Sequence, residues 1–110
     1  MELITKQLER ELKQFPLYSQ DGKGRKAKVL AKFFCGGFTW YVLEYDGKDT
    51  FFGIVIGLES EYGYFSLREL QHVKNKWGLG VERDIYFKPD TLENAAKTEY
   101  YLEEFIKNFD

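Results

Sequence analysis

Apolar side chains recur at helical spacing in the first fifteen residues. The intervals of four, four and three residues place these side chains on one face of a helix. They are Ile4, Leu8, Leu12 and Phe15. Pro16 disfavours helical geometry in the residue before it. The pattern therefore predicts a helix over residues 4–15, followed by a polar, glycine-containing turn at residues 19–24.

The next part of the chain is rich in β-branched and aromatic residues and is divided by short polar or glycine-rich links. Asp46-Gly47 is a typical hairpin signal. Four strands are predicted, at residues 27–35, 39–45, 51–58 and 62–65. Consecutive strands with short links favour an antiparallel meander.

Helical signals return after the fourth strand. Ser66-Leu67-Arg68-Glu69 has the form of a capping box, so we predict a helix that runs to about Lys76. A further strand is expected at residues 81–87, and a last helix after Asp90-Thr91. The apolar stripe of that last helix comprises Leu92, Ala95, Leu102, Phe105, Ile106 and Phe109.

This order of elements predicts the α+β class. A mostly antiparallel sheet of four to five strands would be covered by N-terminal, middle and C-terminal helices. The 110 residues contain no internal repeat and no linker-like stretch, so we expect a single α+β domain over residues 1–110.

Composition narrows the class of protein further. The single cysteine, Cys35, excludes an intramolecular disulfide and favours a reducing compartment. The N-terminus has no signal-peptide pattern, and the longest apolar stretch, residues 51–58, falls far short of the roughly 20 residues that cross a bilayer. We therefore expect a cytoplasmic protein with no membrane partner.

Charge is distributed unevenly along the chain, although the net charge is only −2. Residues 1–32 contain eight basic and four acidic side chains. Residues 23–32, the basic segment, contain no acidic residue. Its lysines on a strand would meet successive phosphates, with Phe34 available to stack on a base, or they would protect an exposed strand edge. The nucleic-acid candidates are Lys23, Arg25, Lys26 and Lys28.

Aromatic residues make up 18% of the chain, too many rings for a small core to enclose them all. Tyr62 and Tyr64 lie two residues apart, so they share one face of the predicted strand. Together with neighbouring carboxylates they would form an acidic, tyrosine-bearing surface suited to protein recognition. The alternative is that these rings cover the core beneath the terminal helices. The protein-binding candidates are Glu59, Glu61, Tyr62, Tyr64, Glu99, Glu103 and Glu104.

Signals for catalysis are sparse. Glu61 or Asp84 with a divalent metal would suit a small hydrolase, and Cys35 with His72 would form a nucleophilic pair. Turn carboxylates and a buried cysteine explain the same residues without chemistry. The glycines match neither a P-loop nor a dinucleotide fingerprint. We therefore assign no catalytic residue, metal or cofactor, and expect a binding protein rather than an enzyme.

Several sequence blocks resemble an uncharacterised family of small bacterial proteins from plasmids, conjugative elements and phages. The resemblance extends over about residues 1–92. The matching blocks are Trp40-Tyr41-Val42-x-Glu44, Phe51-Phe52-Gly53, Gly63-Tyr64-Phe65-Ser66-Leu67-x-Glu69-Leu70 and Val81-Glu82-Arg83-Asp84. The resemblance implies an accessory protein of a mobile element that binds host defence or replication machinery, and it supplies no catalytic residues.

The leading hypothesis is a non-enzymatic binding protein of a mobile genetic element, for example an anti-CRISPR or anti-restriction inhibitor. Its acidic, tyrosine-bearing surface would dock on a basic groove of a host or defence protein. The alternatives are a nucleic-acid-binding module that uses the basic segment and a small metal-dependent hydrolase. The sequence leaves the partner's identity and the oligomeric state open.

Overall fold

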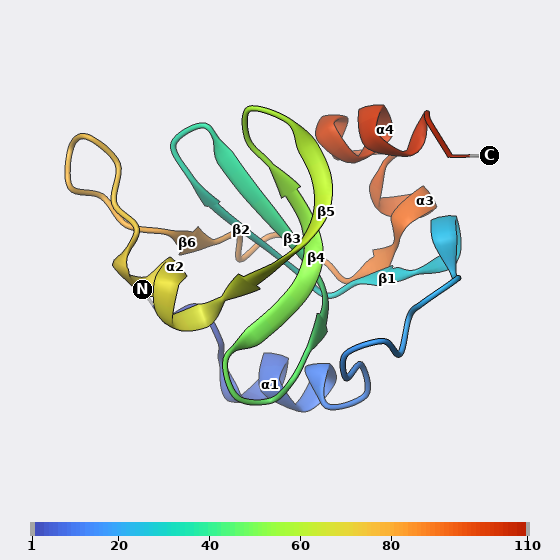
Figure 1. The fold of residues 1–110 in the computed structure, drawn as a ribbon, viewed down its shortest axis with the longest axis horizontal. Helices are drawn as coiled ribbons and strands as arrows, with labels where there is room; N and C mark the ends of the chain where they lie inside the picture. Colours follow the sequence, from blue (N-terminus) through green and yellow to red (C-terminus); the bar gives the residue numbers. More distant parts are fainter. Residues whose placement is uncertain (1, 110) are drawn as a thin grey trace.

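The computed structural model describes residues 2–109, which are built around an antiparallel sheet (Figure 1). Within these residues the main sheet has five strands in the order β5–β4–β3–β2–β6. They are β2 (Ala31–Cys35), β3 (Phe38–Tyr45), β4 (Thr50–Ile56), β5 (Ser60–Ser66) and β6 (Glu82–Arg83). Strands β2 to β5 follow one another in sequence and in space, so the predicted antiparallel meander and the α+β class are confirmed.

Helices cover both faces of the sheet. The helices are α1 (Lys6–Leu12), α2 (Leu67–His72), α3 (Leu92–Ala95) and α4 (Tyr100–Ile106). Leu8 and Leu12 of α1 and Leu70 of α2 belong to one buried cluster, whereas Leu92 of α3 and Leu102 of α4 belong to another. Strand β3 lies between the two clusters and is buried from Thr39 to Tyr45. Figure 1 shows α1 and α2 on the opposite side of the sheet from α3 and α4.

The predicted strand over residues 27–35 is interrupted. Strand β1 (Lys28–Val29) turns away from the main sheet and pairs with β7 (Asp90–Thr91). Leu30 donates its backbone N–H to the carbonyl of Val42 at 2.8 Å, and β2 begins at the next residue. The 3₁₀ helix η1 (Gly24–Lys26) precedes β1, and α3 follows directly after β7. The β1–β7 pair thus brings η1 next to α3.

The helix starts agree with the capping signals better than the helix ends do. Ser66 Oγ accepts the Glu69 N–H at 3.1 Å, as the capping box predicts. Thr5 Oγ1 caps α1 in the same way, so that helix begins at Lys6 and not at Ile4 as predicted. It ends at Leu12, short of the predicted end at Phe15. The expectation that the middle helix reaches Lys76 is wrong, because Val73 is extended and α2 ends at His72.

The last predicted helix is divided in two, although its apolar stripe does face the core. Residues 96–99 separate α3 from α4, and the carboxylate of Glu99 turns inward at this break. The strand predicted over residues 81–87 shortens to β6. Asp84 Oδ1 accepts the N–H of Tyr86 at 2.9 Å, and this turn bends the chain away from the sheet.

A bulge between β3 and β4 shapes the middle of the sheet. The register shifts between Val42 and Glu44, and the backbone of β3 comes close to Gly53 of β4. A Cβ atom at Gly53 would overlap the carbonyl oxygen of Tyr41, so only glycine fits there. Glu44 follows the bulge and is buried, with only 2% of its surface exposed.

Candidate protein-binding surface

Strand β5 forms one edge of the sheet and carries the two predicted tyrosines. Tyr62 pairs with Ile54 of β4, and Tyr64 pairs with Phe52, so both rings lie on the face that α3 and α4 cover. Their exposed fractions are 42% and 55%. The prediction of a shared face is therefore confirmed. Both rings form part of the surface.

Neighbouring rings hold these tyrosines in place. Phe52 stacks on Tyr62 with 5.6 Å between ring centroids and lies 5.0 Å from the ring of Tyr64. The edge of Phe105 in α4 meets Tyr62 at 5.1 Å. Burial against these rings raises the pKa of Tyr62. The tyrosine rings are thus packed on one side and open on the other. Because this packing already restricts the rings, they lose less conformational entropy when a partner binds.

Tyr18 adds a third exposed ring from a loop far away in the sequence. Its side chain shares a hydrogen bond with Tyr64, and this bond raises the pKa of Tyr64. The buried carboxylate of Glu44 holds the loop, because it accepts the backbone N–H groups of Tyr18 at 2.8 Å and Gln20 at 2.9 Å. Tyr18 has a positive φ of 74°, which this pair of bonds supports.

A cleft of about 190 Å³ separates this loop from the sheet. Glu44 and Leu43 lie on its sheet side, together with the rings of Phe52 and Tyr62, and Gln20 and Asp21 contribute from the loop. Because Phe52 and Tyr62 also belong to the tyrosine face, this cleft adjoins that face.

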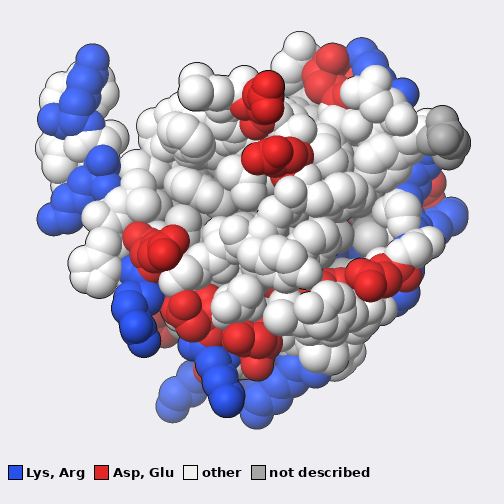
Figure 2. Space-filling model, viewed as in Figure 1, with Lys and Arg blue, Asp and Glu red and all other residues white. Residues whose placement is uncertain are grey.

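Two acidic residues, Glu61 in β5 and Glu59 just before it, lie beside the tyrosines and not between them on the same face. Glu61 pairs with Val55, so its side chain points to the opposite face of the sheet from Tyr62 and Tyr64. Glu59 and Glu61 are both exposed at the β4–β5 turn. Figure 2 shows that the middle of this view is uncharged apart from a few carboxylates, with Lys and Arg toward the rim. We define the edge surface as Tyr18, Phe52, Glu59, Glu61, Tyr62 and Tyr64.

The three predicted acidic residues near the C-terminus differ in their surroundings. Glu99 Oε1 lies 2.7 Å from Lys32 Nζ and accepts the hydroxyl of buried Tyr41 at 2.7 Å. Burial and this hydrogen bond raise the pKa of Tyr41. Glu104 pairs with Lys107 at 2.7 Å, and Glu103 is exposed. Glu99 thus joins the break between α3 and α4 to the sheet, and only Glu103 and Glu104 lie on the surface.

Much of the basic segment is engaged within the molecule. Arg25 donates to the carbonyl of Ile106, the last residue of α4, at 3.0 Å and to that of Phe109 at 3.4 Å. Lys26 pairs with Glu93 of α3 at 2.7 Å. Lys23 and Lys28 are exposed. Two of the four predicted nucleic-acid residues, Arg25 and Lys26, thus have partners within the molecule, although the side chain of Lys26 remains 75% exposed.

The residues proposed for catalysis do not converge. Glu61 lies on β5 at one edge of the sheet, whereas Asp84 follows β6 at the other edge. Within residues 2–109 no three His, Cys, Asp or Glu side chains lie close enough to hold a metal ion. Buried Cys35 directs its thiol to the carbonyl of Leu79 at 3.5 Å, and His72 Nδ1 lies 2.7 Å from the carbonyl of Arg68.

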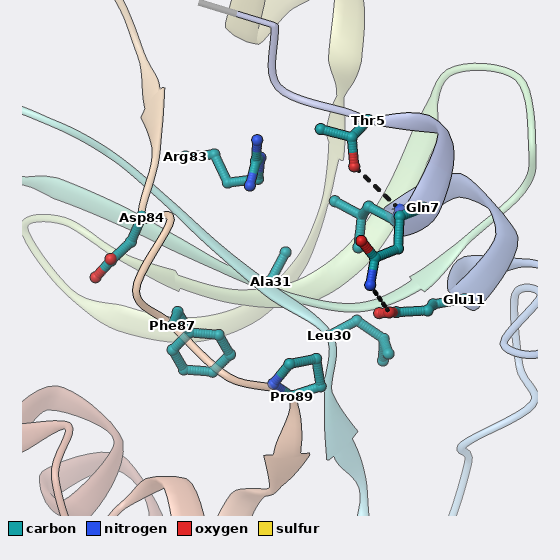
Figure 3. Close-up of a pocket in the computed structure, with 10 residues that line it drawn as sticks. Thr5, Gln7, Glu11, Leu30, Ala31, Arg83, Asp84, Phe87 and Pro89 are labelled. Atoms are coloured by element: carbon teal, nitrogen blue, oxygen red, sulfur yellow. Dashed lines mark hydrogen bonds between the residues drawn. The ribbon is translucent and has the colours of Figure 1, made fainter.

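A second cleft, of about 160 Å³, lies between α1 and the chain that follows β6 (Figure 3). Thr5 caps α1, and Gln7 donates to Glu11 at 3.5 Å, so these polar groups bond within their own helix. The carboxylate of Asp84 points away from Gln7 and Glu11 in Figure 3, and it lies 3.7 Å from Lys32. Thr5, Gln7, Glu11 and Asp84 thus each have a partner within the molecule.

Sequence reasoning missed one exposed aromatic feature. Residues 73–80, the arm, project from the sheet at the left of Figure 1. Trp77 is 73% exposed, and Lys76 Nζ lies 4.5 Å from the centre of its ring. The side chain of Asn75 accepts the N–H groups of Trp77 and Leu79 and so fixes the turn. The signal was Trp77 followed by Gly78, which has φ 78°, in a stretch interpreted only as a helix end.

The fold and the exposed edge define a small α+β protein whose candidate site is a surface on β5. The chain belongs to the family described as protein of unknown function (DUF2958), whose model matches residues 3–99. This match confirms the predicted resemblance to an uncharacterised family and includes all of β5. No curated protein and no solved structure matches the chain significantly. In the described part of the chain, no helix has the length and apolar character needed to span a membrane.

Proposed function

We propose that this protein acts by binding another protein through its edge surface, without chemistry of its own. The observation that carries the proposal is the pair of tyrosines on β5, which are about half exposed and supported from behind by Phe52 and Phe105. Tyrosine is enriched among the residues that dominate binding energy, because it gives a large contact area with few rotatable bonds.

Charge indicates which kind of partner this surface suits. Glu59 and Glu61 flank the tyrosines, and Glu103 and Glu104 are exposed on α4, where Glu104 pairs with Lys107. A partner with a basic docking face would be steered toward these carboxylates. Tyrosine faces also attract lysine and arginine side chains directly. The favoured partner is therefore a protein with a basic groove.

The more specific hypothesis follows from the family resemblance together with this charge. A basic groove is typical of enzymes that bind nucleic acid. We propose that the protein comes from a mobile genetic element and inhibits a host defence enzyme of this kind, such as a CRISPR effector or a restriction enzyme. It would act in the cytoplasm by occupying the groove in a stoichiometric complex.

Capture from host extract with matched variants tests this function. The test variant combines Tyr64→Ala with Glu61→Lys, and the control combines Lys23→Ala with Lys28→Ala; thermal unfolding shows that each is folded. We expect a partner that the wild type and the control retain and that the test variant binds at least about tenfold more weakly. A partner retained by the test variant and lost from the control would contradict the proposal.

A further inference from the structure

The outer side of β5 is an open sheet edge. Within residues 2–109, β5 pairs with β4 and with no other strand. All seven of its residues are exposed or half-buried. The opposite edge of the sheet, β6, is only two residues long. The two edges thus differ, because shortness protects β6 against pairing with another chain and β5 has the length of an average strand.

The hydrogen bonds at the end of the β4–β5 ladder show which backbone groups face outward. Leu67 donates its N–H to the carbonyl of Asp49 at 2.8 Å, and these two residues continue the β4–β5 register. Antiparallel partners alternate between bonded and non-bonded pairs. Odd-numbered residues of β5 therefore bond to β4. The even-numbered residues Ser60, Tyr62 and Tyr64 direct their N–H and C=O groups away from it.

The sequence of β5 lacks the usual means of protecting an edge. It contains no lysine and no proline, and its one charged residue is Glu61. Its pairing with β4 keeps one register along the whole strand, without a bulge. The outward groups of Tyr62 and Tyr64 belong to the same residues whose rings form the edge surface. A ligand strand would therefore gain backbone hydrogen bonds and ring contacts together.

We propose that an extended, basic segment of the partner adds to the sheet as a strand alongside β5. This inference rests on the proposed function and specifies how the edge surface binds. Lysine or arginine side chains on one face of the added strand would lie over Tyr62 and Tyr64. Those on its other face would meet Glu61. A second copy of this chain is the less favourable occupant, because it would bring another acidic β5 to the same edge.

Proline and alanine at the same position separate backbone from side-chain binding. Tyr64→Pro and Tyr64→Ala both remove the ring, but only proline removes the N–H that faces outward, and neither removes a bond to β4. The probe is a synthetic peptide of alternating lysine and valine. We expect it to protect the amides of Tyr62 and Tyr64 from hydrogen exchange in the wild type. Tyr64→Pro should weaken its binding at least about fivefold more than Tyr64→Ala does.

The possible results distinguish this inference from the function beneath it. Equal weakening by the two variants would overturn strand addition and leave a surface that binds through side chains. A peptide that gives no amide protection would also overturn it. Self-association of the wild type that Tyr64→Pro abolishes would assign the edge to a second copy and contradict the basic occupant. The proposed function is tested separately by the capture experiment. It fails if capture of the partner does not depend on Tyr64 and Glu61, whatever the peptide result.

Discussion

The basic segment and the edge surface both stand out in the sequence, but the fold uses them in opposite ways. Arg25, Lys26 and Lys32 contact groups in or near α3 and α4, whereas Tyr62 and Tyr64 remain about half exposed on an open edge. The difference shows that a concentration of charge along the chain does not tell which charges are available to a partner. Availability depends on what the fold places opposite each side chain.

The uneven charge of the chain thus has an internal explanation. Residues 1–32 have an excess of basic side chains, and the acidic side chains that meet them come from the C-terminal third, at Asp84, Glu93 and Glu99. These contacts join η1 to α3, and they join β2 to the turn after β6 and to the break before α4. Part of the asymmetry that resembled a docking signal holds the two ends of the chain together.

Removing the side chain of Gln20, which supports the backbone of the basic segment, should have the largest effect on stability. Gln20 Nε2 donates to the carbonyls of Lys28 and Leu43, and its Oε1 accepts the N–H of Lys28 at 2.6 Å. Gln20→Ala leaves these groups without partners in a buried site and should lower the free energy of unfolding by about 3 kcal/mol. Urea denaturation measures the change, with Gln7→Ala on the exposed face of α1 as control. Equal losses from both variants would refute the role of Gln20.

Removing the Lys32–Glu99 ion pair should have the second-largest effect on stability. Lys32→Met leaves the partly buried carboxylate of Glu99 with only the Tyr41 hydroxyl, so we expect a loss of about 2 kcal/mol. Lys32→Met with Glu99→Gln should recover part of that loss, because residue 99 then no longer carries an unpaired charge. A double-mutant cycle from urea denaturation measures the coupling. Additive losses would show that the two side chains do not interact.

The side chain of Arg25 should contribute less to the free energy of unfolding than the Lys32–Glu99 pair does. Arg25→Ala removes the donor to Ile106 and Phe109 and should cost about 1 kcal/mol, with faster amide exchange in α4. Lys23→Ala, in the same segment but exposed, should leave both quantities unchanged. If the two variants behave alike, Arg25 does not hold α4, and its charge is as available as that of Lys23.

The smallest effect concerns two carboxyl groups, one from each region. The hydrogen bond from Lys26 lowers the pKa of Glu93, while the hydroxyl of Ser66 at the end of β5 lowers the pKa of Asp49. Each carboxylate stabilises the fold above its ordinary pKa, and this contribution is lost as the pH falls through the lowered value. Added salt should raise the pKa of Glu93 toward normal more than that of Asp49, because the charge of Lys26 acts on Glu93 in a direct ion pair, whereas the charge of Arg68 is a lesser cause of the lowered pKa of Asp49. NMR titration at two salt concentrations tests this, and equal responses would contradict it.

Periodic patterns predicted most of the fold because they report local geometry. The β-favouring residues of β3 and β4, the Ser66 cap and the stripe on the last helix all reflect contacts within a few residues or across a hairpin. The errors occur where polar side chains redirect the chain. Asp84 ends β6 early, and Glu99 lies at the break between α3 and α4. A pattern of apolar residues contains no information about such bonds.

The candidate site shows the same division between features that local sequence patterns predict and features that depend on contacts far apart in the chain. A period of two placed Tyr62 and Tyr64 on one face, and the same rule places Glu61 on the other face. The engagement of Lys26 and Arg25 could not be predicted, because their partners lie 67 and 81 residues away in the chain. Tyr18 also joins the edge surface only through the fold, since buried Glu44 holds its loop 26 residues away.

The most direct test compares charge reversal in the two regions. The rate constant for association with the captured partner is measured at low and moderate salt for Glu59→Lys with Glu61→Lys, and for Lys23→Glu with Lys28→Glu. We predict that reversal on the edge surface slows association about tenfold and reduces its dependence on salt, while reversal in the basic segment does not slow it. Slower association from the basic-segment variant, with no change from the edge variant, would contradict the account.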